Sequence, residues 1–225
     1  MQYWYFGVIC VILAVVLEIL EDREKIVEGV ICKTAASALF VLTGFLCAKL
    51  GPGTAFSKWI VIGLCLGFAG DVVLHVRHLF HESMILFAVG TLLFAAGHVC
   101  YIIAIIPLIH GMVGSALLGA VLLSGTALYV IFSMTKPKDK KMAAAAGVYL
   151  TFVGVFTAMA LELCVRGLMT GTFMLAAGAV LFLISDSTLI YGLFAKKGTR
   201  KCRWILMITY YAAQSLIALC LQFIG

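Results

Sequence analysis

The 225-residue chain is 64% hydrophobic and only 12% charged, whereas soluble domains are nearer half apolar and a quarter charged. This composition excludes a soluble globular domain and predicts one integral membrane domain over residues 1–225, with room for about eight spans. The net charge of +6 comes from lysines and arginines outside the apolar runs, so it reports membrane topology, and we expect no nucleic-acid partner.

Eight apolar runs follow one another along the chain and predict eight membrane-spanning helices. An open sheet cannot span lipid, and these runs are too long and too uniformly apolar for the strands of a barrel. The expected spans cover approximately residues 3–20, 30–48, 57–76, 84–106, 113–134, 143–162, 169–192 and 204–224. The predicted fold class is therefore an all-α integral membrane bundle of eight transmembrane helices.

Positive charge is concentrated in alternate connections between these spans. Of the 16 lysines and arginines, all except Lys49, Lys58 and Arg166 lie in or beside the first, third, fifth and seventh connections. The positive-inside rule places such connections in the cytoplasm. We therefore expect both termini on the non-cytoplasmic side of a multi-pass protein, either in a bacterial plasma membrane or in the endoplasmic reticulum.

The second and third spans begin and end with further charged or titratable groups. Lys33 lies near the start of the second span, where snorkelling to the interface is the ordinary role; a contact to an anionic headgroup or to an aspartate is the sharper interpretation. His75, His78 and His81 leave the third span at helical spacing. They suit either a metal face or an interfacial cluster, and their position at the membrane exit favours the cluster. We expect no metal and no cofactor.

Two aspartates lie inside apolar runs, Asp71 in the third expected span and Asp186 in the seventh. A carboxylate within lipid costs about 3 kcal/mol or more, so it normally faces a protein or water-filled interior. At a rise of about 1.5 Å per residue, Asp71, Asp186 and Tyr210 all lie roughly 8–9 Å from the cytoplasmic end of their spans. This shared depth predicts that they meet. The alternative is two unrelated structural acids, each hydrogen-bonded to neighbouring helices.

Other polar groups give weaker signals. His98 and Tyr101 are one turn apart in the fourth span, and His98 is expected about 20 Å from the cytoplasmic side, deeper than the acids. A lone membrane histidine fits a packing role as well as a place in the site. Glu18 falls near the end of the first span and is expected to be solvated. The eight cysteines are scattered and contain no Cys-x-x-Cys pair, which argues against a disulfide framework or a zinc ribbon.

Four short motifs resemble those of the lysoplasmalogenase family, the YhhN-like multi-pass membrane proteins. The motifs occupy residues 70–74, 97–101, 178–187 and 210–217, in the family's order on the third, fourth, seventh and eighth spans. Lys33 also fits, and the resemblance covers about residues 30–222. The first, fifth and sixth spans match the family only in hydropathy, and the histidine cluster is no part of its pattern.

The resemblance implies a hydrolase that cleaves the vinyl ether bond of a lysoplasmalogen, a lysophospholipid of the bilayer, to a fatty aldehyde and a glycerophospho-ethanolamine or -choline. Such a bond hydrolyses when an acid protonates its β-carbon and water captures the oxocarbenium ion, so a neutral carboxylic acid and a carboxylate suffice. We assign Asp71 and Asp186 as this catalytic pair, with their order left open. The side chains expected to orient the pair, the substrate or the water are Lys33, His98, Tyr101, Ser185, Tyr210 and Gln214.

A proton-coupled small-molecule or lipid transporter is the main alternative, because membrane-embedded acids suit it equally well. The low proline content, three residues, argues mildly against the broken helices of many transporters. A non-enzymatic lipid-binding or scaffold protein is the second alternative, and it predicts binding without turnover. Headgroup preference and oligomeric state are left open by the sequence.

Overall fold

The computed structural model describes residues 3–80, 83–109, 113–167, 169–195 and 199–224. Within these ranges the chain forms eight α-helices, each long and apolar enough to cross a membrane, which confirms the predicted all-α membrane bundle. They are α1 (Trp4–Asp22), α2 (Ile26–Leu50), α3 (Ala55–Val76), α4 (Met84–Ile105), α5 (Val113–Thr135), α6 (Lys140–Arg166), α7 (Thr170–Phe194) and α8 (Arg200–Cys220). Short 3-10 turns, η1 (Arg77–Leu79) and η2 (Ile106–Leu108), follow α3 and α4.

Three helices begin about one turn before their apolar runs, in the basic connections. α2 begins at Ile26, α6 at Lys140 and α8 at Arg200. At α6 the Asp139 side chain accepts hydrogen bonds from the backbone N–H groups of the next residues, at 2.9 and 3.1 Å. Such N-caps satisfy N–H groups that have no partner within the helix. Hydropathy does not register such caps, which α6 and α8 have, so these two expected spans started too late; α2 begins early without a side-chain cap.

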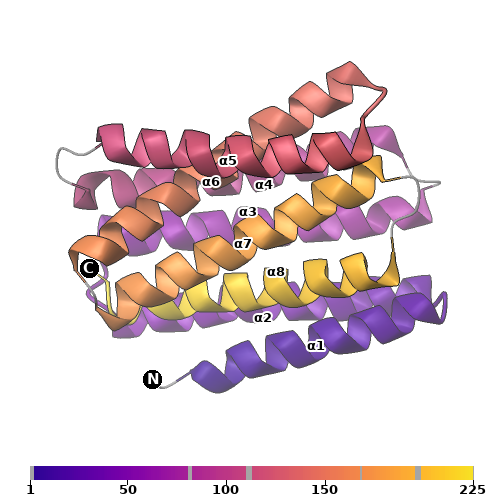
Figure 1. Cartoon of the computed structure of the whole chain (residues 1–225). Helices are drawn as coiled ribbons and strands as arrows, with labels where there is room; N and C mark the ends of the chain where they lie inside the picture. Colours follow the sequence, from indigo (N-terminus) through magenta and orange to yellow (C-terminus); the bar gives the residue numbers. More distant parts are fainter. Residues whose placement is uncertain (1–2, 81–82, 110–112, 168, 196–198, 225) are drawn as a thin grey trace.

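Six helices form a closed circuit of contacts, and two lie outside it (Figure 1). The circuit runs from α2 to α3, α4, α6, α7, α8 and back to α2. Outside it, α1 packs against α2 and α8, and α5 packs against α6 and α7. Figure 1 shows that α1 begins and α8 ends at the same end of the bundle. The circuit encloses an interior that polar side chains can reach without facing lipid.

Glycines let α3 and α4 approach closely along this circuit. A Cβ atom on Gly97 would lie 3.2 Å from the carbonyl oxygen of Gly63, and a Cβ on Gly70 would lie 2.8 Å from the Phe94 ring. Small residues at points of contact are the usual means by which membrane helices pack. Asp71 directly follows Gly70, so this close packing also determines where Asp71 lies relative to α4.

An ion-pair cluster joins the end of α1 to the start of α8. Nη2 of Arg203 lies 2.6 Å from Oδ1 of Asp22, and its Nε lies 3.6 Å from Oε2 of Glu18. Arg200 also pairs with Asp22, at 2.6 Å. Glu18 is fully buried, so the expectation that it is solvated was wrong. The early start of α8 is the reason, because it brings Arg203 against α1.

Candidate functional site

Asp71 lies on α3, is buried, and is held by side chains from α2 and α8. Its Oδ2 accepts hydrogen bonds from the hydroxyls of Ser37 and Tyr210, both at 2.7 Å. Nζ of Lys33 lies 3.4 Å from its Oδ1. Two donated hydrogen bonds and a cation are the surroundings that suit a carboxylate, which can only accept.

Lys33 reaches Asp71 because α2 starts before the apolar run. The lysine lies about two turns inside the helix and is only 7% exposed, so it does not snorkel to the interface. The alternative prediction for Lys33, a contact to an aspartate, agrees with the structure. Ser37 follows Lys33 by one helical turn and therefore shares its face. Tyr211 contacts the Ser37 hydroxyl at 3.1 Å and extends this cluster.

A chain of hydrogen bonds leads away from Asp71 through α8 to α4. Nε2 of Gln214 donates to the Tyr210 hydroxyl at 3.2 Å, and the Tyr101 hydroxyl donates to Oε1 of Gln214 at 3.0 Å. Tyr210 and Gln214 lie one turn apart on α8. The structure thus joins Tyr101, Tyr210 and Gln214, all predicted from the sequence, to Asp71 in one buried network.

Asp186, on α7, is equally buried but has fewer partners. Its Oδ2 accepts a hydrogen bond of 2.5 Å from the Tyr149 hydroxyl on α6. Among the residues that the structure describes, no lysine or arginine pairs with it. The two aspartates therefore differ in their surroundings: Asp71 lies beside a cation, and Asp186 lies beside a phenol and apolar walls.

A cavity of about 80 Å³ lies between the two aspartates' partners. Asp186 lines it directly, whereas Asp71 lies behind Lys33 and Tyr210, which both line it. Asp186 and Tyr210 therefore share one cavity, and Tyr210 connects it to Asp71; the described hydrogen bonds do not join the two carboxyl groups, so their direct meeting stays a prediction. The cavity has room for a few water molecules, which need polar partners of this kind. Its full lining is Lys33, Leu74, Phe94, Tyr149, Ser185, Asp186, Leu189, Leu206, Met207 and Tyr210.

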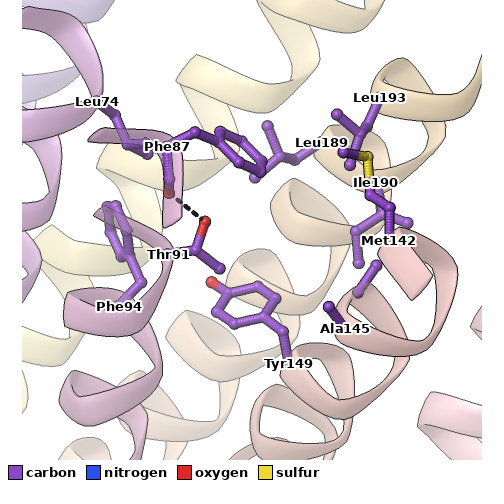
Figure 2. A pocket seen from close by; sticks show the side chains of 11 residues that line it. Leu74, Phe87, Thr91, Phe94, Met142, Ala145, Tyr149, Leu189, Ile190 and Leu193 are labelled. Carbon is purple, nitrogen blue, oxygen red and sulfur yellow. Dashed lines mark hydrogen bonds between the residues drawn. The ribbon is translucent and has the colours of Figure 1, made fainter. Parts of the chain in front are cut away.

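A second cavity, of about 100 Å³, adjoins the first and is apolar (Figure 2). The two share the walls Leu74, Phe94, Tyr149 and Leu189. The rest of its lining comes from the first turns of α4 and α6 and the last turns of α7: Phe87, Thr91, Met142, Ala145, Ala146, Ile190 and Leu193. Figure 2 shows these side chains surrounding an open centre. Both cavities are mostly apolar, and the one that Asp186 lines thus continues into the second.

Two further candidate residues, Ser185 and His98, have no described hydrogen bond to either aspartate. Ser185 lines the same cavity as Asp186, but its hydroxyl donates to the Leu206 carbonyl at 3.2 Å, so it joins α7 to α8. His98 is buried among aromatic rings, with its ring centroid 4.6 Å from that of Phe182 and 5.9 Å from that of Tyr149. Its Nδ1 bonds the backbone carbonyl one turn earlier at 2.9 Å. His98 therefore reaches the site through Tyr149.

Sequence reasoning missed Tyr149 and Ser37. The sixth span resembles the family in hydropathy alone, and a tyrosine in an apolar helix is an ordinary packing residue. Only its place opposite Asp186 reveals its role. Ser37 could have been found, because it lies one turn after Lys33 and so shares the face that carries a buried cation.

Of the predicted histidine cluster, the structure describes only the side chain of His75. Nε2 of His75 lies 3.7 Å from Oε1 of Glu21, on the side of α3 that faces the α1–α2 turn. His81 and the side chain of His78 lie outside the part of the chain that the structure describes. Among the described residues, no group of three or more histidine, cysteine or acidic side chains could hold a metal ion.

Comparison with known proteins identifies one relationship. The model of the YhhN family matches residues 30–221, a range that contains both cavities and the whole bonded network around Asp71. No curated protein and no solved structure matches the chain.

Proposed function

The chain belongs to the YhhN family, and from that premise we propose that it is a membrane hydrolase that cleaves the vinyl ether bond of lysoplasmalogens. The products are a fatty aldehyde and a glycerophospho-ethanolamine or -choline. The observation that carries the proposal is the unlike bonding of two buried aspartates, of which Asp186 lines a cavity and Asp71 is bonded to two side chains that line it. That cavity continues into an apolar chamber suited to an alkyl chain.

The surroundings of the two aspartates suggest which is the acid. Asp71 is paired with Lys33 and accepts two hydrogen bonds, an arrangement that stabilises a carboxylate. Asp186 has a phenol as its described hydrogen-bond donor and no described cation paired with it, and a buried carboxyl group without a paired cation is easier to keep neutral. We therefore assign Asp186 as the general acid and Asp71 as the carboxylate. Carboxyl groups in unlike environments divide acid and base roles in the same way in other hydrolases.

The reaction then needs only protons and one water. Asp186 gives its proton to the β-carbon of the vinyl ether, which leaves an oxocarbenium ion next to the cavity that Asp186 lines. Water adds to the cationic carbon while its proton passes to the Tyr210 hydroxyl, whose own proton moves to Asp71 along their 2.7 Å hydrogen bond. The hemiacetal then returns its hydroxyl proton to Asp186, and Asp71 returns a proton through Tyr210 to the departing glycerol oxygen. Both aspartates end as they began, and one water has been consumed.

The substrate can be placed by its chemistry. Its alkyl chain suits the apolar cavity, and its charged end suits a third cavity, of about 380 Å³, beside the α1–α2 turn. That cavity is lined by Glu21, Glu24, Lys25, Ile26, His75 and Arg203, which offer cations for a phosphate and carboxylates for an ammonium group. His75 lies one turn from Asp71 on α3, so neighbouring turns of one helix would lie beside the headgroup and the vinyl ether.

The test is to incubate the purified protein with a lysoplasmalogen and with the matched alkyl-ether lysolipid, and to measure aldehyde release. We expect aldehyde from the vinyl ether alone. Asp186→Asn should lower the rate by about 10²–10⁴-fold, the usual contribution of general acid catalysis. Glu162→Gln, in an i,i+4 pair with Arg166 near the end of α6, removes an acid that lines none of these three cavities and should change nothing. If the folded wild type releases no aldehyde, or Asp186→Asn keeps full activity, the proposal fails.

A further inference from the structure

Two side-chain hydroxyls at the start of α3, the end remote from the aspartates, lack described hydrogen-bond partners. Its N-cap, Thr54, makes no side-chain capping hydrogen bond. Within the described part of the chain, Oγ1 of Thr54 and Oγ of Ser57 have no hydrogen-bond partner, although Ser57 is only 3% exposed. The first N–H groups of a helix also lack partners within it. A buried polar group without a partner costs about 1–3 kcal/mol, so these groups indicate a missing acceptor.

The same groups line a groove of about 570 Å³ between α2 and α3. Thr54, Ser57 and Lys58 supply its polar end. The remaining lining is mostly apolar: Phe45, Ala48, Gly53, Val61, Ile62, Cys65 and Leu66. Because Phe45 is 48% exposed in a chain that spans the membrane, the groove opens toward lipid and not toward the interior.

The charge at the polar end selects an anion. A helix N-terminus carries about half a positive charge, and its free N–H groups make it a ready anion site. Lys58 adds a full positive charge and is exposed. It is one of only three lysines and arginines outside the four basic connections. An anion that also fills the adjoining apolar groove must carry an alkyl chain.

We propose that the N-terminal end of α3 binds the phosphodiester group of a membrane phospholipid, with one acyl chain lying along the groove between α2 and α3. The hydroxyls of Thr54 and Ser57 and the first N–H groups of α3 donate to the phosphate oxygens, and Lys58 neutralises the charge. The site is separate from the hydrolase site, because Ser57 and Asp71 lie about 21 Å apart along α3. It does not rest on the proposed activity.

The test titrates the full-length protein in detergent with phosphatidylglycerol and counts retained lipid by native mass spectrometry. Ser57→Ala and Lys58→Gln should each raise the dissociation constant several-fold, and together about tenfold, because charge-assisted hydrogen bonds are lost. Lys49→Gln is the matched control: it removes the same charge at the same end of the bundle, from an exposed residue outside the groove.

Inorganic phosphate distinguishes the two sources of the anion. We expect it to compete only at concentrations far above those of the lipid, since it gains nothing from the apolar groove. Equal competition by phosphate would overturn the lipid proposal, and so would a Lys58→Gln variant that retains phosphatidylglycerol as well as the wild type. Because Lys58 is exposed, its replacement does not threaten folding.

Discussion

Nζ of Lys33 and Oδ1 of Asp71 lie 3.4 Å apart, and both side chains are almost fully buried. A buried ion pair adds little net stability, because the cost of removing both charges from water offsets their attraction. Removing one partner alone is different, since the remaining charge is stranded in a medium of low dielectric. We interpret the pair as the means by which α2 keeps the negative charge of Asp71 at one place beside the cavity.

Lys33→Met is therefore expected to destabilise the protein by about 3–5 kcal/mol, the usual effect of breaking a buried pair. Adding Asp71→Asn should restore most of this loss, because no unpaired charge is left. A double-mutant cycle of unfolding in detergent measures the coupling, with exposed Lys49→Met as the control for loss of a lysine. Single effects that simply add would show that the two side chains do not interact.

Tyr149→Phe tests the single hydrogen bond that Asp186 receives. Loss of the phenol hydroxyl leaves the carboxyl group misoriented and without a partner, an effect of about 1–3 kcal/mol, so we expect aldehyde release to fall by about 10–100-fold. Tyr129→Phe removes the same atom from a residue that is 76% exposed and should be neutral. Equal rates for the two variants would remove Tyr149 from the mechanism.

The membrane spans and the two aspartates were predictable because both depend on the cost of polarity in lipid. Apolar runs of sufficient length have no alternative to the helix, and a carboxylate within such a run must face inward. Depth along the helix axis then placed Asp71, Asp186 and Tyr210 in one layer. Tyr210 hydrogen-bonds to Asp71 and lines the same cavity as Asp186, whereas a direct meeting of the two aspartates stays a prediction.

The residues that hydrogen-bond to the aspartates were harder to predict from the sequence, because they depend on which helices are neighbours. Tyr149 belongs to α6, and nothing in the apolar pattern shows that α6 packs between α4 and α7. Glu18 is buried for a similar reason, since its partner Arg203 lies in a turn of α8 that precedes the apolar run. Helix caps and neighbour relations, which hydropathy does not encode, account for both errors.

Gly63→Ala tests the close packing of α3 on α4. A Cβ there would clash with the Tyr101 ring and lie 3.0 Å from the Gly97 carbonyl oxygen. Overpacking of this kind costs about 1–3 kcal/mol, and displacing Tyr101 should also disturb its hydrogen bond to Gln214. We expect lower stability in detergent unfolding and lower activity. Gly125→Ala, where no atom lies within 4 Å of the new Cβ, should be neutral or stabilising by up to about 1 kcal/mol.

The apolar cavity of Figure 2 offers a test of chain binding that does not touch the aspartates. Ala145 lines this cavity but is exposed, so it lies at the rim, whereas its neighbour Ala144 is exposed and lies outside the lining. Ala145→Phe and Ala144→Phe add the same bulk to the same turn of α6. The first should narrow the entrance, and the second should point into lipid.

We expect Ala145→Phe to raise the KM for long-chain lysoplasmalogens by about tenfold, as if two buried CH₂ groups of about 0.8 kcal/mol each had lost their contacts. The kcat should change little, because Asp186 and Tyr149 keep their hydrogen bond. A short-chain substrate, which does not extend past the rim, should be hydrolysed with unchanged KM. Measuring both constants over a series of chain lengths therefore distinguishes a blocked chain site from general damage. If Ala144→Phe and Ala145→Phe behave alike, the alkyl chain leaves the site by another route.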